Sequence, residues 1–233
     1  STQEYIDLAN SISRGLLRLG IKPGDKIAVI SHNNRPEWNI LDIGILQIGA
    51  INVPVYPTIS ESDYKFIFND SQVKLCFVSN DELFGKANAI IEDVTTLTDI
   101  YSFLPVDGCK NWQEVLDNGK DTGNQNEVDE LKNKVDAMDL ATLIYTSGTT
   151  GLPKGVMLSH NNIVTNCKAS IERLPTNDTA DGLSFLPVCH VFERMILYLY
   201  QITGVSIYFA ESIDTIKENI AEVKPHVFTA VPR

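Results

Sequence analysis

The sequence has few cysteines, and none is placed for a metal or redox site. Cys76, Cys109, Cys167 and Cys189 lie far apart, and no C-x-x-C pair is present. Zinc-binding modules and disulfide-rich secreted domains keep their cysteines at short, recurring spacings. We therefore expect reduced and mostly buried thiols, and neither a structural metal nor a redox motif.

Positive charge is also scarce. The 233 residues contain 19 lysines and arginines against 30 aspartates and glutamates, which gives a formal net charge of −11 at pH 7. A general nucleic-acid-binding protein must neutralise phosphates along a groove and needs the opposite balance. Any polyanionic ligand of this chain must therefore be held by a local cluster of donors.

Long apolar runs are missing as well. The most apolar stretch, 195–210, contains Gln201, Thr203 and Ser206 and is shorter than the roughly 20 residues of a membrane span. The first residues include acids, whereas a secretory signal peptide begins with basic residues followed by an apolar run. We expect a cytoplasmic protein and leave open whether it contacts a membrane peripherally to collect a substrate.

What the sequence does contain is an alternation of helix and strand patterns, which predicts an α/β fold with mainly parallel sheets flanked by helices. A helical pattern over 6–19 is followed by a short apolar strand over 26–30, and Pro36 lies in the first turn of a second helix. The 52–57 segment is extended, and its prolines favour a sheet edge or a strand end. From residue 140 onward, strands and helices alternate again to the end of the chain.

An acidic stretch divides this pattern. Eight acidic residues and three lysines lie between Glu114 and Asp139, together with glycines and asparagines. We interpret 114–139 as a solvated linker that tightens into a short helix near 131–138. It would separate a first α/β segment, 1–113, from a second, 140–233. Because the chain stops directly after an expected strand, we also expect the protein to be truncated here.

One segment carries a dense set of groups suited to phosphate. Residues 145–155 follow an apolar strand and have the sequence YTSGTTGLPKG. Hydroxyls donate to phosphate oxygens, glycines let backbone N–H groups wrap an anion, and a lysine adds positive charge. The segment is not a Walker A loop, because Pro153 and Gly155 flank Lys154, and it lacks the G-x-G-x-x-G spacing. It predicts a phosphate-binding loop, with a hydrophilic surface turn as the alternative.

This segment and the VMLSH that follows it resemble the signature of the adenylate-forming superfamily, and specifically of the acyl-CoA synthetases. The block FLPVCHVFER, residues 185–194, resembles a second part of the long-chain fatty acid CoA ligases. Residues 35–38, 49–57 and 224–233 resemble further parts in the same order. The resemblance covers essentially the whole chain. It implies the amino-terminal part of such an enzyme, with two stacked α/β subdomains of its large amino-terminal domain.

The resemblance implies a two-step ligation with ATP, magnesium and coenzyme A. A fatty acid carboxylate attacks the α-phosphate of Mg-ATP to give an acyl-adenylate and pyrophosphate, and the thiol of coenzyme A then displaces AMP. The first step needs positioning and charge neutralisation more than acid–base chemistry. The acidic residue that holds magnesium, the adenine contacts and a mobile carboxyl-terminal domain are expected after Arg233. Residues 1–233 alone are therefore expected to bind ATP weakly and to be inactive.

The candidate phosphate ligands all come from the 145–155 segment: Thr146, Ser147, Gly148, Thr149, Thr150, Gly151, Lys154 and Gly155. Lys154 is also expected to act in catalysis by neutralising the leaving pyrophosphate. The second candidate catalytic residue is His190, which the resemblance places beside the acyl carboxylate, so we expect it to orient the substrate. From the residues alone, a partly buried histidine that donates to a backbone carbonyl fits equally well. Glu193 and Arg194 look like an ordinary pair at a helix start, and we leave them outside the site.

Two other interpretations stay open. One is a different enzyme on the same scaffold, such as an amino-acid adenylation module or an aryl-CoA ligase. The other is a nucleotide-binding or interaction domain that has lost catalysis. The block around His190 favours the fatty-acid branch, and the presence of Lys154 and the glycines weighs against lost catalysis. The expected partners are a fatty acid, ATP, coenzyme A and the rest of the same chain, whereas chain-length preference and oligomeric state are not predicted.

Overall fold

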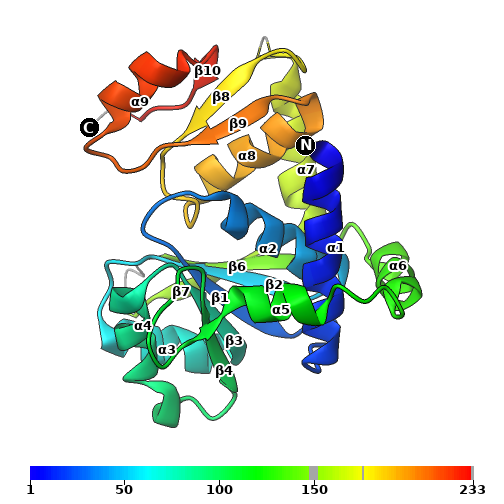
Figure 1. Cartoon of the computed structure of the whole chain (residues 1–233), viewed down its shortest axis with the longest axis vertical. Helices are drawn as coiled ribbons and strands as arrows, with labels where there is room; N and C mark the ends of the chain where they lie inside the picture. Colours follow the sequence, from blue (N-terminus) through cyan, green and yellow to red (C-terminus); the bar gives the residue numbers. More distant parts are fainter. Residues whose placement is uncertain (147–151, 175, 232–233) are drawn as a thin grey trace. The chain divides into compact units, whose positions relative to one another are not determined.

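The computed structural model describes residues 1–146, 152–174 and 176–231, which form two compact units (Figure 1). Unit 1 comprises residues 1–31 and 37–160, and unit 2 comprises residues 32–36 and the chain from 161 onward. The sequence predicts a division at 114–139, but the two units divide elsewhere. Residues 140–160 belong to unit 1 because their two strands are hydrogen-bonded into its sheet.

Unit 1 is built on a seven-stranded sheet in the order β5-β4-β3-β1-β2-β6-β7. The strands are β1 (Lys26–Ile30), β2 (Ile51–Val55), β3 (Val73–Val78), β4 (Asp99–Ser102), β5 (Lys110–Asn111), β6 (Leu140–Thr146) and β7 (Lys154–Ser159). Neighbouring strands are parallel except β6 and β7, which are antiparallel. The predicted α/β fold with a mainly parallel sheet is confirmed.

Helices cover both faces of this sheet. They are α1 (Thr2–Arg18), α2 (Pro36–Gln47), α3 (Glu61–Ser71), α4 (Asp81–Asn88), α5 (Trp112–Asn118) and α6 (Gln125–Lys134), with a short 3₁₀ turn over Ile91–Asp93. On one face, α3 and α4 pack against Ala28 and Ile30 of β1 and their neighbours in β2 and β3. On the other face, Phe77 stacks on Tyr101 and on Phe103, and Phe103 packs edge-on against Trp112 of α5. Alternate residues of each strand thus supply two separate cores.

Strand β2 is central in the sheet, so the sheet edge that its prolines favoured is wrong, whereas Pro54 is the last residue but one of the strand. All five of its residues are buried, and β1 and β6 flank it. Its carbonyl at Asn52 faces β6, where Thr142 Oγ1 donates to it at 2.7 Å. Pro54 lies two residues on, beyond the Asn52–Thr142 pair that joins β2 to β6. The proline is tolerated because its missing N–H falls outside the paired part of that ladder.

Unit 2 has a three-stranded parallel sheet in the order β10-β8-β9. Its elements are α7 (His160–Ile171), β8 (Asp181–Ser184), α8 (Val191–Thr203), β9 (Ser206–Phe209), α9 (Ile216–Val223) and β10 (Val227–Phe228). Its core gathers Ile196, Leu199 and Tyr200 of α8 around Ala180 and Val205. At Gly182 of β8, a Cβ would lie 2.9 Å from the Tyr200 ring, so the glycine admits that aromatic side chain.

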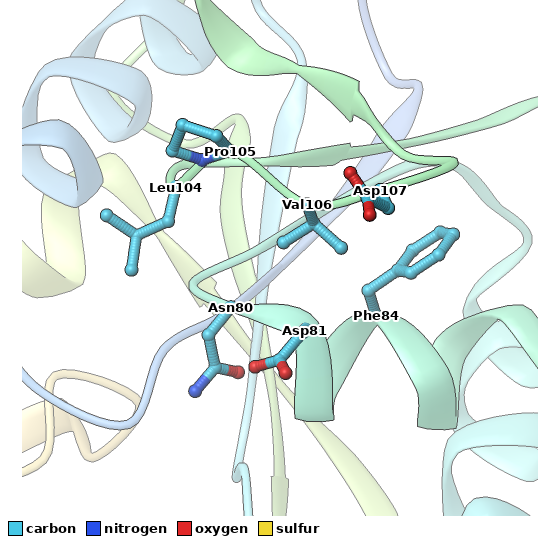
Figure 2. A pocket seen from close by; sticks show the side chains of 7 residues that line it. All are labelled: Asn80, Asp81, Phe84, Leu104, Pro105, Val106 and Asp107. Atoms are coloured by element: carbon cyan, nitrogen blue, oxygen red, sulfur yellow. The ribbon is translucent and has the colours of Figure 1, made fainter.

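The carboxyl ends of β3 and β4 border a cavity of about 490 Å³ (Figure 2). The 104–107 loop lies over the first turn of α4, and the cavity is lined by Asn80, Asp81, Phe84, Leu104, Pro105, Val106 and Asp107. Within the described part of the chain, no helix is both long and apolar enough to cross a membrane.

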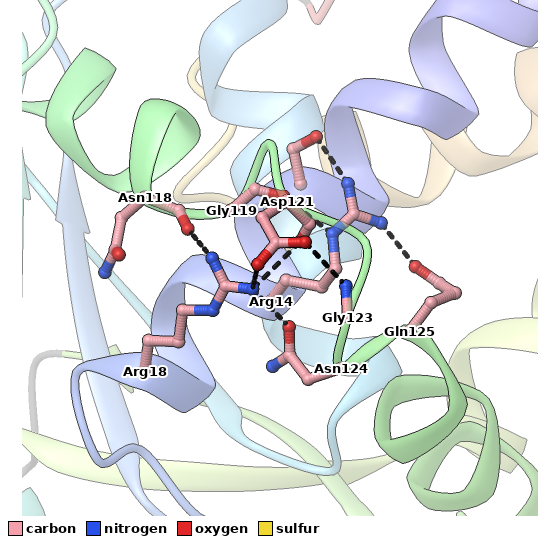
Figure 3. Close-up of polar contacts among 9 residues, drawn as sticks. Arg14, Arg18, Asn118, Gly119, Asp121, Gly123, Asn124 and Gln125 are labelled. Carbon is pink, nitrogen blue, oxygen red and sulfur yellow. Dashed lines mark hydrogen bonds and ion pairs between the residues drawn. The ribbon is translucent and has the colours of Figure 1, made fainter.

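The segment expected to be a solvated linker is instead held against α1 by two arginines (Figure 3). Arg14 Nε donates to the Gly119 carbonyl at 2.6 Å, and its guanidinium also donates to Gln125. Arg18 donates to the carbonyls of Asn118 and Asp121. Two helices lie in this region: α5 ends at Asn118, and α6 begins at Gln125 and ends at Lys134 rather than covering 131–138. Charge and turn residues suggested solvation, but partners about 100 residues away in sequence fix this segment.

Two glycines let α1 and α5 approach each other closely. A Cβ on Gly119 would lie 1.8 Å from the Ser11 carbonyl oxygen, and one on Gly15 would lie 2.1 Å from the Val115 carbonyl oxygen. Both contacts involve backbone atoms, so no side-chain rotation would relieve them.

We predict that Gly119→Ala lowers the free energy of unfolding by about 3 kcal/mol or more, because α5 would have to move away from α1. Gly85→Ala is the matched control, since Gly85 lies inside α4 and a Cβ added there would meet no heavy atom within 4 Å. That variant should be neutral or more stable by about 0.5–1 kcal/mol. Urea unfolding of the complete protein measures both, and equal stabilities of the two variants would contradict the close approach of α1 and α5.

Candidate functional site

The predicted phosphate segment begins and ends on two paired strands. Thr146 is the last residue of β6, Lys154 is the first residue of β7, and the two residues are opposite each other in the antiparallel ladder. Since β6 is parallel to β2, Thr146 lies at the carboxyl edge of the parallel sheet, where α/β proteins bind ligands. The sequence located the segment but did not predict β7.

The side chains of Thr146 and Lys154 are exposed. No ion pair joins Lys154 to any residue that the structure describes. Its ammonium group can therefore bind an anion without first breaking an ion pair with a described carboxylate. An exposed hydroxyl and an ammonium group suit phosphate oxygens.

The other predicted ligands are only partly described. Gly155 is the second residue of β7 and pairs with Tyr145. Ser147, Gly148, Thr149, Thr150 and Gly151 lie outside the described residues, so their assignment to the phosphates stays a prediction.

His190 caps helix α8 in unit 2. Its backbone is extended, with φ −89° and ψ 132°, and its Nδ1 accepts a hydrogen bond from the Phe192 amide at 3.3 Å. A nitrogen that accepts carries no proton, so in the neutral imidazole the proton is on Nε2. The side chain is exposed. The alternative of a partly buried histidine that donates to a backbone carbonyl does not fit this exposed side chain, and Nε2–H is a donor with a fixed tautomer.

Behind His190, Glu193 is buried in a polar network. It is 1 % exposed and accepts hydrogen bonds from Ser184 Oγ at 2.5 Å and Thr229 Oγ1 at 3.0 Å. Asn34 Nδ2 donates to Ser184 Oγ at 2.6 Å and to the Leu186 carbonyl at 2.7 Å. The network thus joins the 32–36 segment, the end of β8 and the first turn of α8. It fixes both ends of the 185–190 connection that carries His190.

Glu193 and Arg194 are not an ordinary exposed pair at a helix start. Arg194 is 2 % exposed, and its Nε donates to Tyr198 Oη at 3.1 Å while the guanidinium lies over the Tyr198 ring. The one sequence signal for this burial is that both charges stand inside the otherwise apolar helix pattern of 191–201. The sequence offered no means of pairing Glu193 with Ser184 or Thr229.

The four cysteines are free, as predicted, and Cys76, Cys167 and Cys189 are buried. Burial raises the pKa of Cys189 to about 12. The thiol next to His190 is therefore protonated near neutral pH and is a poor nucleophile.

The cavity of Figure 2 contains none of the predicted site residues. Asp81 and Asp107 at its rim would repel a phosphate. Among the described residues, no group of three or more His, Cys, Asp or Glu side chains could hold a metal ion. We assign no step to a magnesium ion here.

Comparison with known proteins decides the family. The family model described as AMP-binding enzyme matches residues 1–233. The chain belongs to the AMP-binding enzymes. This agrees with the resemblance carried by the 145–155 and 185–194 segments.

Curated relatives of this AMP-binding chain are long-chain fatty acid ligases. Long-chain-fatty-acid–CoA ligase FadD15 of Mycobacterium bovis is 34% identical over 224 residues, which cover 94% of this chain and 36% of the relative. Human long-chain-fatty-acid–CoA ligase 1 is 30% identical over 247 residues, which cover 100% of this chain and 35% of the relative. The chain thus spans about a third of the length of the curated relatives it matches.

Solved structures support the fold of the AMP-binding chain. A Mycobacterium tuberculosis fatty acyl CoA synthetase superposes with a TM-score of 0.85 at 24% sequence identity, covering 100% of this chain and 44% of that one. At this identity the likeness concerns the fold alone.

The buried carboxyl of Glu193 gives a pH prediction. Burial raises its pKa, although hydrogen bonds from Ser184 and Thr229 oppose the shift. Such a group stabilises the fold fully below its unfolded pKa, about 4.3, and loses that contribution as the pH rises through its folded pKa. We expect the thermal stability of the wild type relative to Glu193→Gln to fall as the pH rises from about 4 to neutral.

Glu193→Ala is the companion variant. It leaves the buried Ser184 hydroxyl without its acceptor and should lower the free energy of unfolding by about 1–3 kcal/mol. The stability of this variant should not depend on the titration of residue 193. A constant stability difference between wild type and Glu193→Gln over this pH range would show that the folded pKa of Glu193 is not raised.

Proposed function

We propose that this chain is part of an enzyme that activates a long-chain fatty acid with ATP and then transfers the acyl group to coenzyme A. The observation that carries the proposal is the paired placement of Thr146 and Lys154 at the carboxyl edge of the sheet. The match to the AMP-binding enzymes and the identity of the curated relatives support it.

The chemistry is balanced without an outside oxidant or reductant. A carboxylate oxygen of the fatty acid forms a bond to the α-phosphorus of ATP, and the bond to the bridging oxygen breaks, so pyrophosphate leaves with that electron pair. The sulfur of coenzyme A then attacks the acyl carbon, the thiol proton goes to solvent, and AMP leaves. In the first step two anions approach each other, so charge neutralisation and alignment supply most of the acceleration.

The residues of this chain would divide these tasks. Lys154 neutralises charge on the leaving pyrophosphate, and Thr146 donates from its hydroxyl at the other end of the same segment. His190 directs Nε2–H toward the fatty acid carboxylate and orients it, because Nδ1 is already occupied by the Phe192 amide. None of these roles requires a general base.

Two competing functions differ in measurable ways. Another acid-CoA ligase or an adenylation enzyme would exchange pyrophosphate with aryl or amino acids rather than with long-chain fatty acids. A non-catalytic nucleotide-binding domain would bind ATP without exchange. The proposed cytoplasmic location, with peripheral membrane contact left open, and the expected inactivity of residues 1–233 alone stay predictions.

In the full-length protein, Lys154→Ala should lower ATP–pyrophosphate exchange with a long-chain fatty acid by roughly one to three orders of magnitude, because one preorganised cation is lost. Lys154→Arg keeps the charge and should recover part of the rate. Lys132→Ala, on exposed α6, is the control and should leave exchange unchanged. Exchange by Lys154→Ala at the wild-type rate would remove this lysine from the mechanism.

His190→Asn separates the two roles available to this residue. Asparagine is a good N-cap and keeps an acceptor for the first turn of α8, but it lacks the Nε2–H donor. If His190 orients the acid, both His190→Asn and His190→Ala should raise the KM for the fatty acid by about tenfold, as expected for a lost hydrogen bond to a charged group. Wild-type kinetics in His190→Asn, with a defect confined to His190→Ala, would show that His190 only caps the helix.

A further inference from the structure

Tyr145 extends from β6 across to β7, next to the two described ends of the phosphate segment. It is opposite Gly155 in the antiparallel ladder, one pair before Thr146 and Lys154. A Cβ on Gly155 would lie 3.1 Å from Tyr145 Cζ and 3.3 Å from its Oη. Glycine at this position therefore makes room for the ring, a reason that concerns packing rather than the approach of an anion.

The hydroxyl of Tyr145 is bonded to a different element. Its Oη donates to Asp70 Oδ2 at 2.5 Å, and Asp70 lies in the last turn of α3. The tyrosine is 7% exposed and packs in the core cluster that includes Ile67 and Phe68 of the same helix. This arrangement ties α3, β6 and β7 together within unit 1.

The bond has the character of a strong one. Its acceptor is a carboxylate and its donor a largely buried hydroxyl, and short O–H···O⁻ bonds of this kind are about twice as strong as neutral ones. Desolvation and the Asp70 carboxylate raise the pKa of Tyr145, so the hydroxyl stays protonated and donates throughout the neutral range.

We propose that Tyr145, Asp70 and Gly155 form an anchor that positions Thr146 and Lys154 for ATP. The Tyr145 and Asp70 side chains act on ATP only through the placement of β6 and β7, and Gly155, which is also a predicted phosphate ligand, contributes here the space for the Tyr145 ring. It holds the last residue of β6 and the first residue of β7 at a fixed separation and orientation. The inference rests on the proposed function for the identity of the ligand, but its geometry comes from the contacts of Tyr145 alone.

The test uses the complete protein and four variants. Tyr145→Phe removes the Oη bond and keeps the ring, and Gly155→Ala pushes the ring away from its place. Asp70→Ala removes the acceptor, whereas Asp70→Asn keeps a carbonyl oxygen in its position. The matched control is Tyr64→Phe, because Tyr64 lies on α3 in the same core cluster and donates to the backbone carbonyls of Tyr56 and Pro57.

The kinetic constants for ATP and for the fatty acid are measured separately by pyrophosphate exchange, and Mg-ATP binding is measured without acid. Tyr145→Phe, Gly155→Ala and Asp70→Ala should each weaken Mg-ATP binding and lower kcat by roughly ten- to hundredfold, with the KM for the fatty acid unchanged. Asp70→Asn should recover most of the loss. The double variant with Tyr145→Phe and Asp70→Ala should bind Mg-ATP no more weakly than either single variant, because the two substitutions remove the same hydrogen bond. Tyr64→Phe should lose stability but keep its ATP binding.

Two outcomes would overturn the anchor. One is Mg-ATP binding by Tyr145→Phe that equals that of Tyr64→Phe at equal stability, which would leave Tyr145 a structural residue. The other is an additive loss in the double variant. If the wild type shows no exchange with any acid, the proposed function fails. The anchor is then tested by the Mg-ATP binding of the same variants alone. A wild type that does not bind Mg-ATP would overturn both.

Discussion

The pairing of β6 with β7 is the constraint on which the predicted site depends. A chain with a net charge of −11 can hold a polyanion only where donors converge, and here the exposed Thr146 and Lys154 are placed opposite each other by a backbone ladder. The ladder is itself attached to the parallel sheet through β2. The backbone positions of Thr146 and Lys154 relative to each other are thus set by main-chain hydrogen bonds, which vary far less than the rotamers of a surface lysine.

Unit 2 presents its candidate residue in a different way. His190 is exposed, yet its orientation is set by the Phe192 amide, and behind it a carboxylate with 1 % exposure collects hydrogen bonds from other segments of the unit. Removing a carboxylate from water is costly unless donors replace the water. The donors that do so, Ser184 and Thr229, are small hydroxyls on the strand side of the unit. Polar bonds at both ends, together with the buried Val188 and Cys189, therefore define the connection that carries His190.

The sequence was informative wherever a local pattern determined the structure. Strand β1 has the predicted bounds, and α2 begins at Pro36 as the sequence indicates. It failed where the determining partner was distant. Arg14 and Arg18 hold the 118–125 region from α1, and no pattern near Glu114 indicates them. Strand β7 was missed because its first residues, Lys154 and Gly155, belong to a motif whose composition suggests a turn, and only pairing with β6 makes them a strand.

The position of Pro54 has a consequence for biosynthesis. The ribosome completes β2 about 85 residues before it reaches β6, counted from Val55 to residue 140, so β2 has one unpaired edge while that stretch is being made. An exposed edge of fully apolar strands is a template for pairing with other chains. Because Pro54 has no N–H and faces the same side as Asn52, this temporary edge lacks a donor in its middle. A residue that looks unfavourable in a central strand thus leaves this temporary edge with one backbone donor fewer for pairing with another chain.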